Sequence, residues 1–292
     1  MNILTFDIEE WSVEKKLHGG RESRYRQFDE AFEIVLNELE KNSIKATFFC
    51  LGKLATEFPG VIRSISEHGH EIGCHSDEHG WLTKMDEKTL RQDTLDAIHA
   101  LEDVSGQRVK SYRAPAFSIT ENNLWAIDVL AECGIENDAS IFPASRSIGG
   151  FAAFPSDKPC IISHNGVRLK EFPVCITSLF GKKIAYSGGG YFRLLPYWYI
   201  NRLFNNEDYS IFYFHLKDLI HTRRKMMTRS AYEEYFHEPG TFINRFLRYS
   251  KNNIGNKNSQ EKFLRIISAN KLISLETACS MIDWGKVKTV SL

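Results

Sequence analysis

The first half of the chain alternates short apolar runs with longer segments whose apolar residues recur at helical spacing. Phe32, Val35, Leu36 and Leu39 illustrate the second kind, because they fall at i, i+3, i+4 and i+7 and share one helical face. The short runs predict buried strands. The predicted strands cover residues 2–8, 45–51, 70–75, 109–113, 135–138 and 209–215. The predicted helices include the face at 32–39, cover 53–68, 86–104 and 121–133, and recur near 230–250 and 274–283.

A strand followed by a helix, repeated along the chain, predicts an α/β fold with parallel strands joined by helical crossovers. The periodicity leaves two closures open, a (β/α) barrel and an open doubly wound sheet. No Gly-x-Gly-x-x-Gly motif follows the first strand, which disfavours the dinucleotide-binding form of the open sheet. Residues 143–195 are predicted as loops and β-segments, and the polar stretch 250–262 as a mobile loop.

The composition is that of an ordinary globular protein and argues against several classes of function. The 292 residues include 37 Lys plus Arg and 37 Asp plus Glu, and this zero net charge argues against broad electrostatic binding to nucleic acid or an anionic membrane. No apolar stretch is long enough to span a bilayer. The six cysteines form no Cys-x-x-Cys pair, which argues against a zinc ribbon. Because the first residues do not resemble an export signal, we expect a cytoplasmic protein.

Polar side chains with catalytic potential follow the predicted strands at their carboxyl ends. In α/β barrels this edge carries the active site, and scattered surface charge would not prefer it. The residues are Asp7 and Glu9 after the first strand, His75 and His79 after the third, Arg113 after the fourth, Asp138 after the fifth, and His215 after the strand at 209–215.

His75 and His79 form a His-x-x-x-His pair, which by itself is a weak metal signal because two surface histidines on one turn have the same spacing. The acidic run Asp7-Ile8-Glu9-Glu10 on a neighbouring strand end changes the balance, because it supplies a carboxylate, and imidazole and carboxylate groups are good ligands for zinc-like divalent ions. Three protein ligands leave one coordination position for water, as a catalytic site requires. We therefore predict a divalent metal site.

Asp7 and His215 are candidates for acid–base chemistry. A hydrolase that activates water needs a base for the water and an acid for the leaving group. His215 follows the apolar run "IFYF", where an environment that excludes water could shift its pKa. A buried structural histidine with all its hydrogen bonds made would have the same neighbours. Arg113 could orient a carboxylate through bidentate hydrogen bonds, or form a plain structural ion pair.

Five motifs, in this order, resemble those of the polysaccharide deacetylases, the NodB-homology group of carbohydrate esterases (family 4). They are "TFDIEE" (5–10), "HSDEH" (75–79), "RAP" (113–115), "DASIFP" (138–143) and "YFH" (213–215). The resemblance covers roughly residues 2–220. The stretch "SGGGYFRLLPYW" (187–198) is similar to an extension of deacetylases encoded with exopolysaccharide and O-antigen genes.

The resemblance implies a single domain over residues 1–292, with a distorted, TIM-like (β/α) barrel of about seven strands over 1–220 and a helical extension over 221–292. It implies removal of an N-acetyl group from an amino sugar in a surface polysaccharide or its precursor, with release of acetate. It implies a divalent metal, most often zinc, with cobalt, nickel, manganese and iron as alternatives. The implied roles are Asp7 as general base, Glu9, His75 and His79 as metal ligands, Arg113 as the group that orients Asp7, Asp138 as a partner of Arg113, His215 as general acid, and Tyr213, Pro115 and Trp81 as substrate contacts.

The first motif departs from the family pattern at Ile8. The common pattern has two adjacent aspartates, the second of which binds the metal, and Ile8 stands in that place. Some relatives use an Asp-x-Asp spacing, which would make Glu9 the ligand, and strand alternation turns Asp7 and Glu9 to the same face. Glu10 stays open as the ligand if the strand ends at Glu9. The departure also leaves open a family member that has lost catalysis.

Two other functions stay open on the sequence: a related C–N amidohydrolase acting on a small amide, and a catalytically inactive saccharide-binding relative. The carrier of the sugar is open too, since a polysaccharide, a lipid-linked sugar and a nucleotide-linked sugar all fit. Arg223, Arg224 and Lys225 follow the last strand and could hold a diphosphate, or form a solvated basic turn. The sequence does not predict the metal's identity or the oligomeric state.

Overall fold

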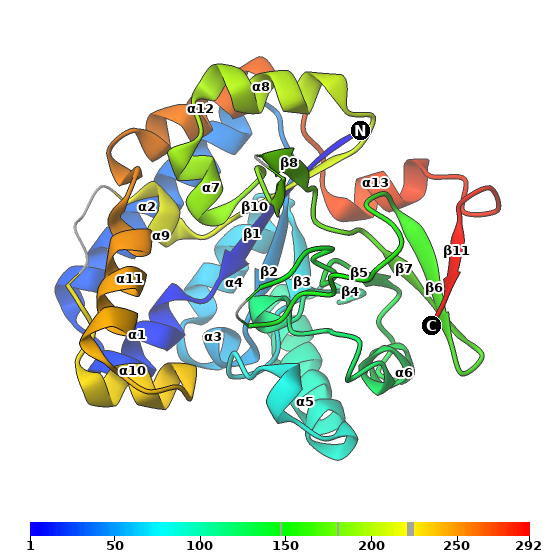
Figure 1. The fold of residues 1–292 in the computed structure, drawn as a ribbon, viewed down its shortest axis with the longest axis horizontal. Helices are drawn as coiled ribbons and strands as arrows, with labels where there is room; N and C mark the ends of the chain where they lie inside the picture. The colour runs from blue at the N-terminus through cyan, green and yellow to red at the C-terminus, as the bar shows by residue number, and fades with distance from the viewer. Residues whose placement is uncertain (147, 180, 221–224) are drawn as a thin grey trace.

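The sheet at the centre of the molecule is parallel over most of its width (Figure 1). The computed structural model describes residues 1–146, 148–179, 181–220 and 225–292. Within these residues nine strands form one sheet in the order β10-β1-β2-β3-β4-β5-β7-β6-β11, in which β6 and β7 pair antiparallel. In that order the strands are β10 (Ser210–Phe214), β1 (Asn2–Ile8), β2 (Thr47–Cys50), β3 (Glu71–Cys74), β4 (Ser111–Tyr112), β5 (Asn137–Asp138), β7 (Val167–Glu171), β6 (Cys160–His164) and β11 (Thr289–Ser291). A separate antiparallel pair joins β8 (Thr177–Leu179) and β9 (Lys182–Ile184).

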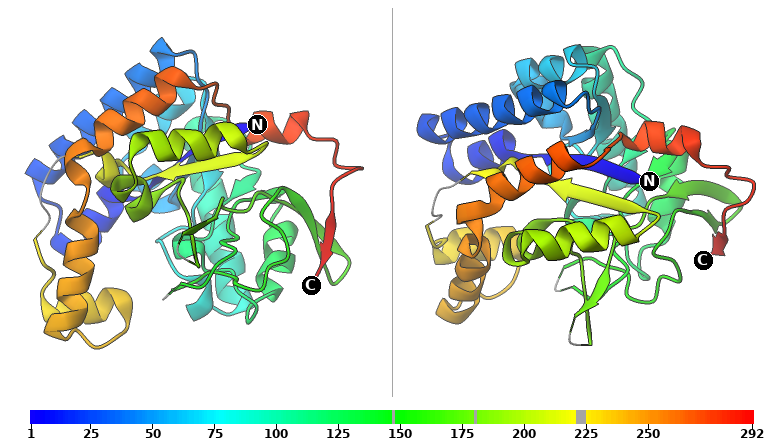
Figure 2. Two further views of the ribbon diagram at one scale, coloured as in Figure 1. Left: turned by 45° about the horizontal axis from the view of Figure 1, so that its top comes forward. Right: turned by 90° about the horizontal axis from the view of Figure 1, so that it is seen from above.

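Helices lie against the sheet and along its edges. They are α1 (Glu10–His18), α2 (Glu22–Lys41), α3 (Gly52–Glu57), α4 (Pro59–Glu67), α5 (Glu87–Ser105), α6 (Trp125–Glu132), α7 (Gly189–Leu194), α8 (Tyr197–Asn206), α9 (Leu216–Leu219), α10 (Arg229–Phe236), α11 (Phe242–Asn253), α12 (Ser259–Ala269) and α13 (Leu275–Met281). Short 3-10 turns are η1 (Leu82–Lys84), η2 (Pro115–Phe117) and η3 (Asn256–Asn258). Figure 2 shows α2, α12 and α8 running alongside β1 and β10.

Strand β1 lies inside the sheet and is buried on both faces. Its residues from Ile3 to Ile8 are buried, and β10 and β2 pair with it in parallel on either side. Phe6 stacks on Phe48 of β2 with ring centroids 4.8 Å apart, and the ring of Phe214 on β10 lies 6.2 Å away. A strand that is covered on both faces suits a parallel sheet between helical layers. This packing fixes the carboxyl ends of β10, β1 and β2 side by side.

The α/β class and the strand positions predicted from the sequence are confirmed. A strand occurs within each of the six predicted ranges, although β4 and β5 are two residues long. Strands β1 to β5 follow one another as in a barrel, and β10 joins β1. Among the residues with described positions β10 and β11 do not pair, so the barrel stays open and is distorted in this sense. The strands β6, β7 and β11 bring the sheet beyond the seven strands expected.

Two predicted elements differ in the structure. The helix expected over 53–68 is divided into α3 and α4, because Pro59 begins α4 and has no N–H with which to continue α3. The stretch 250–262, expected as a mobile loop, contains the end of α11, η3 and the start of α12. Helix α12 buries apolar side chains such as Phe263, and this burial outweighs the polar composition of the residues before it.

The described part of the predicted helical extension, residues 225–292, contains α10 to α13 and also a strand. That strand, β11, pairs in parallel with β6 at the edge of the sheet, so the extension is not purely helical. Within the described residues, no helix combines the length and the apolar character needed to cross a bilayer.

Candidate active site

Two carboxylates lie where β1 ends. Asp7 is within β1, and Glu9 directly precedes α1. Strand alternation turns Asp7 and Glu9 to one face, while Ile8 packs into the core. Both carboxylates are 2 % exposed, and a buried carboxylate needs a counter-charge or a metal. Their partners come from the segments that follow β3, β4 and β10.

His75 and His79 follow β3 and meet Glu9. The chain turns sharply between them, since Ser76 and His79 have φ angles of 70° and 63°. One ligand atom from each of Glu9, His75 and His79 lies within 4.8 Å of the other two. The closest pair is His79 Nε2 and Glu9 Oε2, at 2.5 Å. The structure thus brings together the three residues predicted as metal ligands.

The protonation of this cluster suits a divalent cation. Burial lowers the pKa of His75 to about 4, so its ring is neutral near pH 7. Its Nδ1 donates to the carbonyl oxygen of Arg113 at 2.6 Å, which leaves the Nε2 lone pair available for a metal. Glu9 Oε2 is buried and faces His79 Nε2. Two imidazoles and a buried carboxylate fit a zinc-like ion.

The other oxygen of Glu9 faces protein cations. Glu9 Oε1 contacts Lys217 Nζ and lies 3.6 Å from His215 Nε2. Burial would raise the pKa of Glu9, but the charges of Lys217 and His79 hold it well below its usual value, so Glu9 is ionised. Glu10 accepts a hydrogen bond from the backbone N–H of Lys217 at 3.0 Å, and burial raises its pKa. Glu9 rather than Glu10 is therefore the carboxylate of the cluster.

Arg113 reaches Asp7 from the end of β4 and is fully buried. Its Nη1 lies 2.8 Å from Asp7 Oδ1 and 2.6 Å from Thr5 Oγ1, and its Nε donates to the carbonyl oxygen of Ala139 at 3.1 Å. Its Nη2 has no partner among the described groups, so it binds Asp7 through one N–H rather than two. Burial would raise the pKa of Asp7, yet the charge and the hydrogen bond of Arg113 help to keep it below its usual value. Asp7 is therefore an ionised carboxylate held in place by Arg113.

His215 lies where β10 ends and faces Asp7. Its Nε2 is 3.9 Å from Asp7 Oδ2, and its Nδ1 is 3.4 Å from Asp218 Oδ2. Asp218 in turn forms a buried ion pair with Arg193 of α7. Burial would lower the pKa of His215, but the charge of Glu9 and the hydrogen bond with Asp218 contribute to raising it above the usual value. The carboxylate of Asp7 and the imidazole of His215 thus face each other at the sheet edge.

Asp138 ends β5 but does not contact Arg113 through any described hydrogen bond, which corrects the predicted pairing. Its Oδ1 accepts a hydrogen bond from Ser140 Oγ at 2.5 Å, and Ser140 accepts one from the backbone N–H of Ala114 at 2.7 Å. Burial raises the pKa of Asp138, and burial together with Asp138 raises that of Glu171 on β7 well above its usual value. Through Ser140, Asp138 therefore supports the backbone of the "RAP" turn.

The three predicted substrate contacts lie in different surroundings. Tyr213 is buried on β10, two residues before the candidate acid, and Pro115 is buried at the start of η2. Trp81 is half-buried, and its ring packs edge-on against Tyr235 and His237, each 6.0 Å away between centroids. Trp81 therefore lies where the loop after β3 meets α10.

The glycines of the "SGGG" stretch pack against Tyr213. Gly188 forms an isolated parallel bridge with Tyr213. A Cβ atom at Gly188 would lie 2.4 Å from the carbonyl oxygen of Tyr213, so no larger residue fits without a shift of the backbone. The close packing of Gly188 on Tyr213 supports β10, the strand that ends directly before His215.

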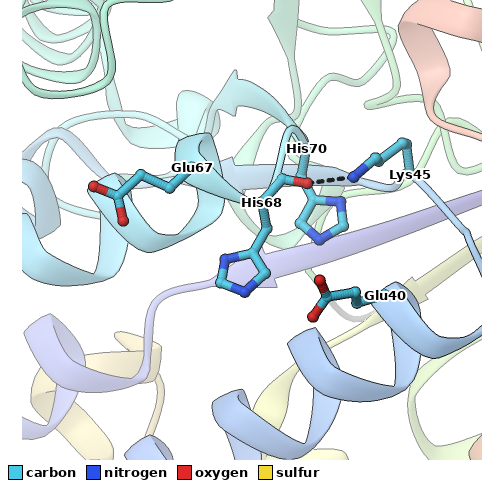
Figure 3. A pocket seen from close by; sticks show the side chains of 5 residues that line it. All are labelled: Glu40, Lys45, Glu67, His68 and His70. Atoms are coloured by element: carbon cyan, nitrogen blue, oxygen red, sulfur yellow. Dashed lines mark hydrogen bonds between the residues drawn. The ribbon is translucent and has the colours of Figure 1, made fainter.

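Arg223 and Arg224 of the predicted basic stretch lie outside the described residues, and Lys225 is exposed. A polar cavity of about 260 Å³ lies before β2 and β3, at the amino ends of the strands and so at the edge opposite the cluster (Figure 3). It is lined by Glu40, Lys45, Glu67, His68 and His70.

Comparison with known proteins divides the chain at the end of β5. Residues 3–137 match the family model described as polysaccharide deacetylase. This match covers 135 of the 292 residues, and over it the chain is similar to the polysaccharide deacetylases. Residues 139–278 match a domain of unknown function, DUF3473. The deacetylase segment contains Asp7, Glu9, His75, His79 and Arg113, and the second segment contributes Tyr213 and His215 to the same edge of the sheet.

Known deacetylases are similar to part of the chain. A peptidoglycan-N-acetylglucosamine deacetylase of Bacillus cereus is 36 % identical over 95 residues, which cover 32 % of this chain and 34 % of that protein. A chitooligosaccharide deacetylase of Azorhizobium caulinodans is 29 % identical over 115 residues, covering 39 % and 50 %. The chain therefore spans a third to a half of the length of these relatives.

One solved structure shares the fold over the whole chain. It is that of a Mycobacterium smegmatis protein described as a candidate polysaccharide deacetylase, which superposes with a TM-score of 0.66 at 19 % identity. The match covers 100 % of this chain and 92 % of that one. The kinship with deacetylases of exopolysaccharide gene clusters stays a prediction.

Sequence reasoning misses four polar residues of this deacetylase-like site or its support: Lys217, Asp218, Arg193 and Glu171. One of them has a local signal, because Asp218 stands three residues after His215, the spacing of a capping box at the start of α9. Arg193 and Glu171 have no such signal, since their partners are remote in the sequence and meet them through the fold.

Proposed function

We propose that this protein removes the N-acetyl group from an amino sugar by metal-dependent hydrolysis. The observation that carries the proposal is the convergence of three parts at the carboxyl ends of β1, β3, β4 and β10: the Asp7–Arg113 pair, the Glu9–His75–His79 cluster and His215. The deacetylase family match over residues 3–137 and the names of the relatives support the same reaction.

Asp7 would act as the general base. Arg113 holds its Oδ1, while its Oδ2 is turned toward His215 and can accept a proton from water. As Asp7 takes that proton, the water oxygen bonds to the carbonyl carbon of the acetyl group. The C–N bond then breaks and His215 gives a proton to the nitrogen. One water and one amide are thereby converted into acetate and a free amine.

Glu9, His75 and His79 would hold the divalent ion. Zinc suits this donor set best, and cobalt, nickel, manganese and iron stay alternatives. When bound, the ion would supply Lewis-acid polarisation of the acetyl carbonyl. The chain prepares the site by keeping His75 neutral and Glu9 ionised.

The proposed substrate class is an N-acetylated saccharide. The names of the relatives refer to peptidoglycan and chitooligosaccharide, which support a polymer or oligomer. Lipid-linked and nucleotide-linked precursors of a surface polysaccharide, met in the cytoplasm, are the alternatives within the proposal.

Acetate release from a panel of substrates tests the function. The panel contains a chitooligosaccharide, a peptidoglycan fragment, and one lipid-linked and one nucleotide-linked N-acetyl sugar, each with zinc-loaded protein and with Asp7→Asn as control. Release by the wild type from at least one of them, abolished in the variant, is the expected result. Release from small amides alone would favour the amidohydrolase, and saccharide binding without any acetate would favour the inactive relative.

Elemental analysis tests the metal site separately. His75→Ala should lose the bound zinc while keeping the fold, because it removes one of three ligands. The matched control is His99→Ala on the exposed face of α5, which should retain the metal. Equal zinc content in the two variants would contradict the site.

A further inference from the structure

Helix α11 exposes a row of large apolar side chains. Phe242, Ile243, Phe246 and Leu247 are 62 %, 68 %, 48 % and 61 % exposed. None of the described residues of α11 is buried, and the helix lies at the periphery of the molecule (Figure 1). Contiguous exposed apolar patches are uncommon on monomeric proteins and mark surfaces that bind a partner or a membrane.

The four side chains occupy one face of α11. At about 100° per residue, the positions from Phe242 to Leu247 cover an arc of about 140°, the width of a face that is normally buried. Arg245 lies beyond one border of this arc, and Lys251 lies beyond the other. Ile254, just past the helix, is also 49 % exposed.

Basic residues predominate along the segment that carries this face, and Glu238 just before it lies 3.8 Å from Arg248. Residues 239–260 contain four basic residues, Arg245, Arg248, Lys251 and Lys257, and no Asp or Glu. The chain as a whole has equal numbers of acidic and basic residues, so this is a local asymmetry. A second copy docking through the same face would bring like charges together. An anionic bilayer instead complements both the apolar row and its basic borders.

We propose that α11 docks this protein onto an anionic lipid bilayer, with its apolar row at the headgroup boundary and its basic residues against the lipid phosphates. This membrane surface goes beyond the proposed hydrolysis. The zero net charge of the chain opposes a broad attraction to membranes, and it does not oppose one local basic and apolar helix.

Docking through α11 would bring the candidate active site close to the bilayer. Arg193, which pairs with Asp218 behind His215, also donates a hydrogen bond to the carbonyl oxygen of Lys251 near the end of α11, at 3.0 Å. Helix α10, directly before α11, packs against Trp81 through Tyr235. The surface proposed to dock is thus attached to the edge of the site.

Co-sedimentation of the full chain with unilamellar vesicles tests the proposal. The vesicles are phosphatidylcholine alone, or phosphatidylcholine with roughly 30 % phosphatidylglycerol. We expect binding to the anionic vesicles, much weaker binding to the neutral ones, and loss of binding at high salt. The double variant Phe246→Glu/Leu247→Glu should reduce the bound fraction at least about tenfold. Met281→Glu is the matched control, because Met281 is 66 % exposed on α13, outside the patch.

Three results would overturn the proposal. They are unchanged vesicle binding by the double variant, equal binding of the wild type to neutral vesicles, and a wild-type dimer that the double variant dissociates. The last would identify the face as an interface between copies. Because Phe246 and Leu247 are exposed, both variants should fold and should release acetate from a soluble substrate like the wild type. That assay separates failure of docking from failure of the proposed function.

Discussion

The buried Asp7–Arg113 pair allows a test of how the proposed base is held. Asp7 and Arg113 are 2 % and 0 % exposed, so neither charge has solvent as an alternative partner. Arg113→Gln leaves the carboxylate of Asp7 buried without its cation. Asp7→Asn leaves the guanidinium of Arg113 with Thr5 and the carbonyl oxygen of Ala139. The double variant replaces both charges by neutral amides.

The free energy of unfolding should respond unequally to these changes. Breaking a buried ion pair from one side lowers stability by about 3–5 kcal/mol, because an uncompensated charge remains. We expect Arg113→Gln to fall in this range. The double variant should be more stable than the sum of the two single effects predicts, by about 2 kcal/mol, since it buries no unpaired charge. Urea unfolding of the four proteins at one pH measures this coupling.

Turnover of the same four proteins decides whether Arg113 acts through Asp7. Asp7→Asn should reduce kcat about 10²–10⁴-fold, as the loss of a general base does. Arg113→Gln should also reduce kcat, because Asp7 loses its orientation. The double variant should be no slower than Asp7→Asn alone, since the residue that Arg113 positions is already absent. Losses that multiply in the double variant would refute the positioning role.

Two further predictions concern histidines at opposite ends of the sheet. Asp218→Asn should lower kcat with little change in KM. It should also move the alkaline limb of the pH–rate profile to lower pH, because it removes one of the groups that raise the pKa of His215. An unchanged alkaline limb would contradict this role of Asp218. Burial lowers the pKa of His70 from 6.5 to about 4. Between these two pH values the unfolded chain therefore binds more protons than the folded one. Stability should therefore fall by about 2 kcal/mol between pH 7 and pH 5 from this group, and His70→Gln should remove that part of the slope in urea unfolding while the exposed control His99→Gln should not. An equal slope in both variants would contradict it.

The local pattern of the sequence was sufficient to predict the strands and the polar residues at their carboxyl ends. The run from residue 2 to residue 8 is short and mostly apolar, which is enough to predict a buried strand. Since parallel strands share one carboxyl edge, Asp7, His75, Arg113 and His215 could be expected to meet there. These predictions depend on a period of two residues and on strand direction, and both are properties of short segments.

The tertiary structure decided which of these groups contact one another. Glu9 rather than Glu10 joins the histidines, because α1 begins directly after Glu9 and the backbone of Lys217 binds Glu10. Likewise, α12 forms next to a polar stretch because its apolar face is buried against α2 and α9.

Asp138 supports the turn after β4 instead of binding Arg113, and Arg193 reaches Asp218 from α7. Such pairings join segments that are far apart in the chain. A single sequence records the residues but not the distances that packing imposes between them, so partners of this kind become visible only in the folded protein.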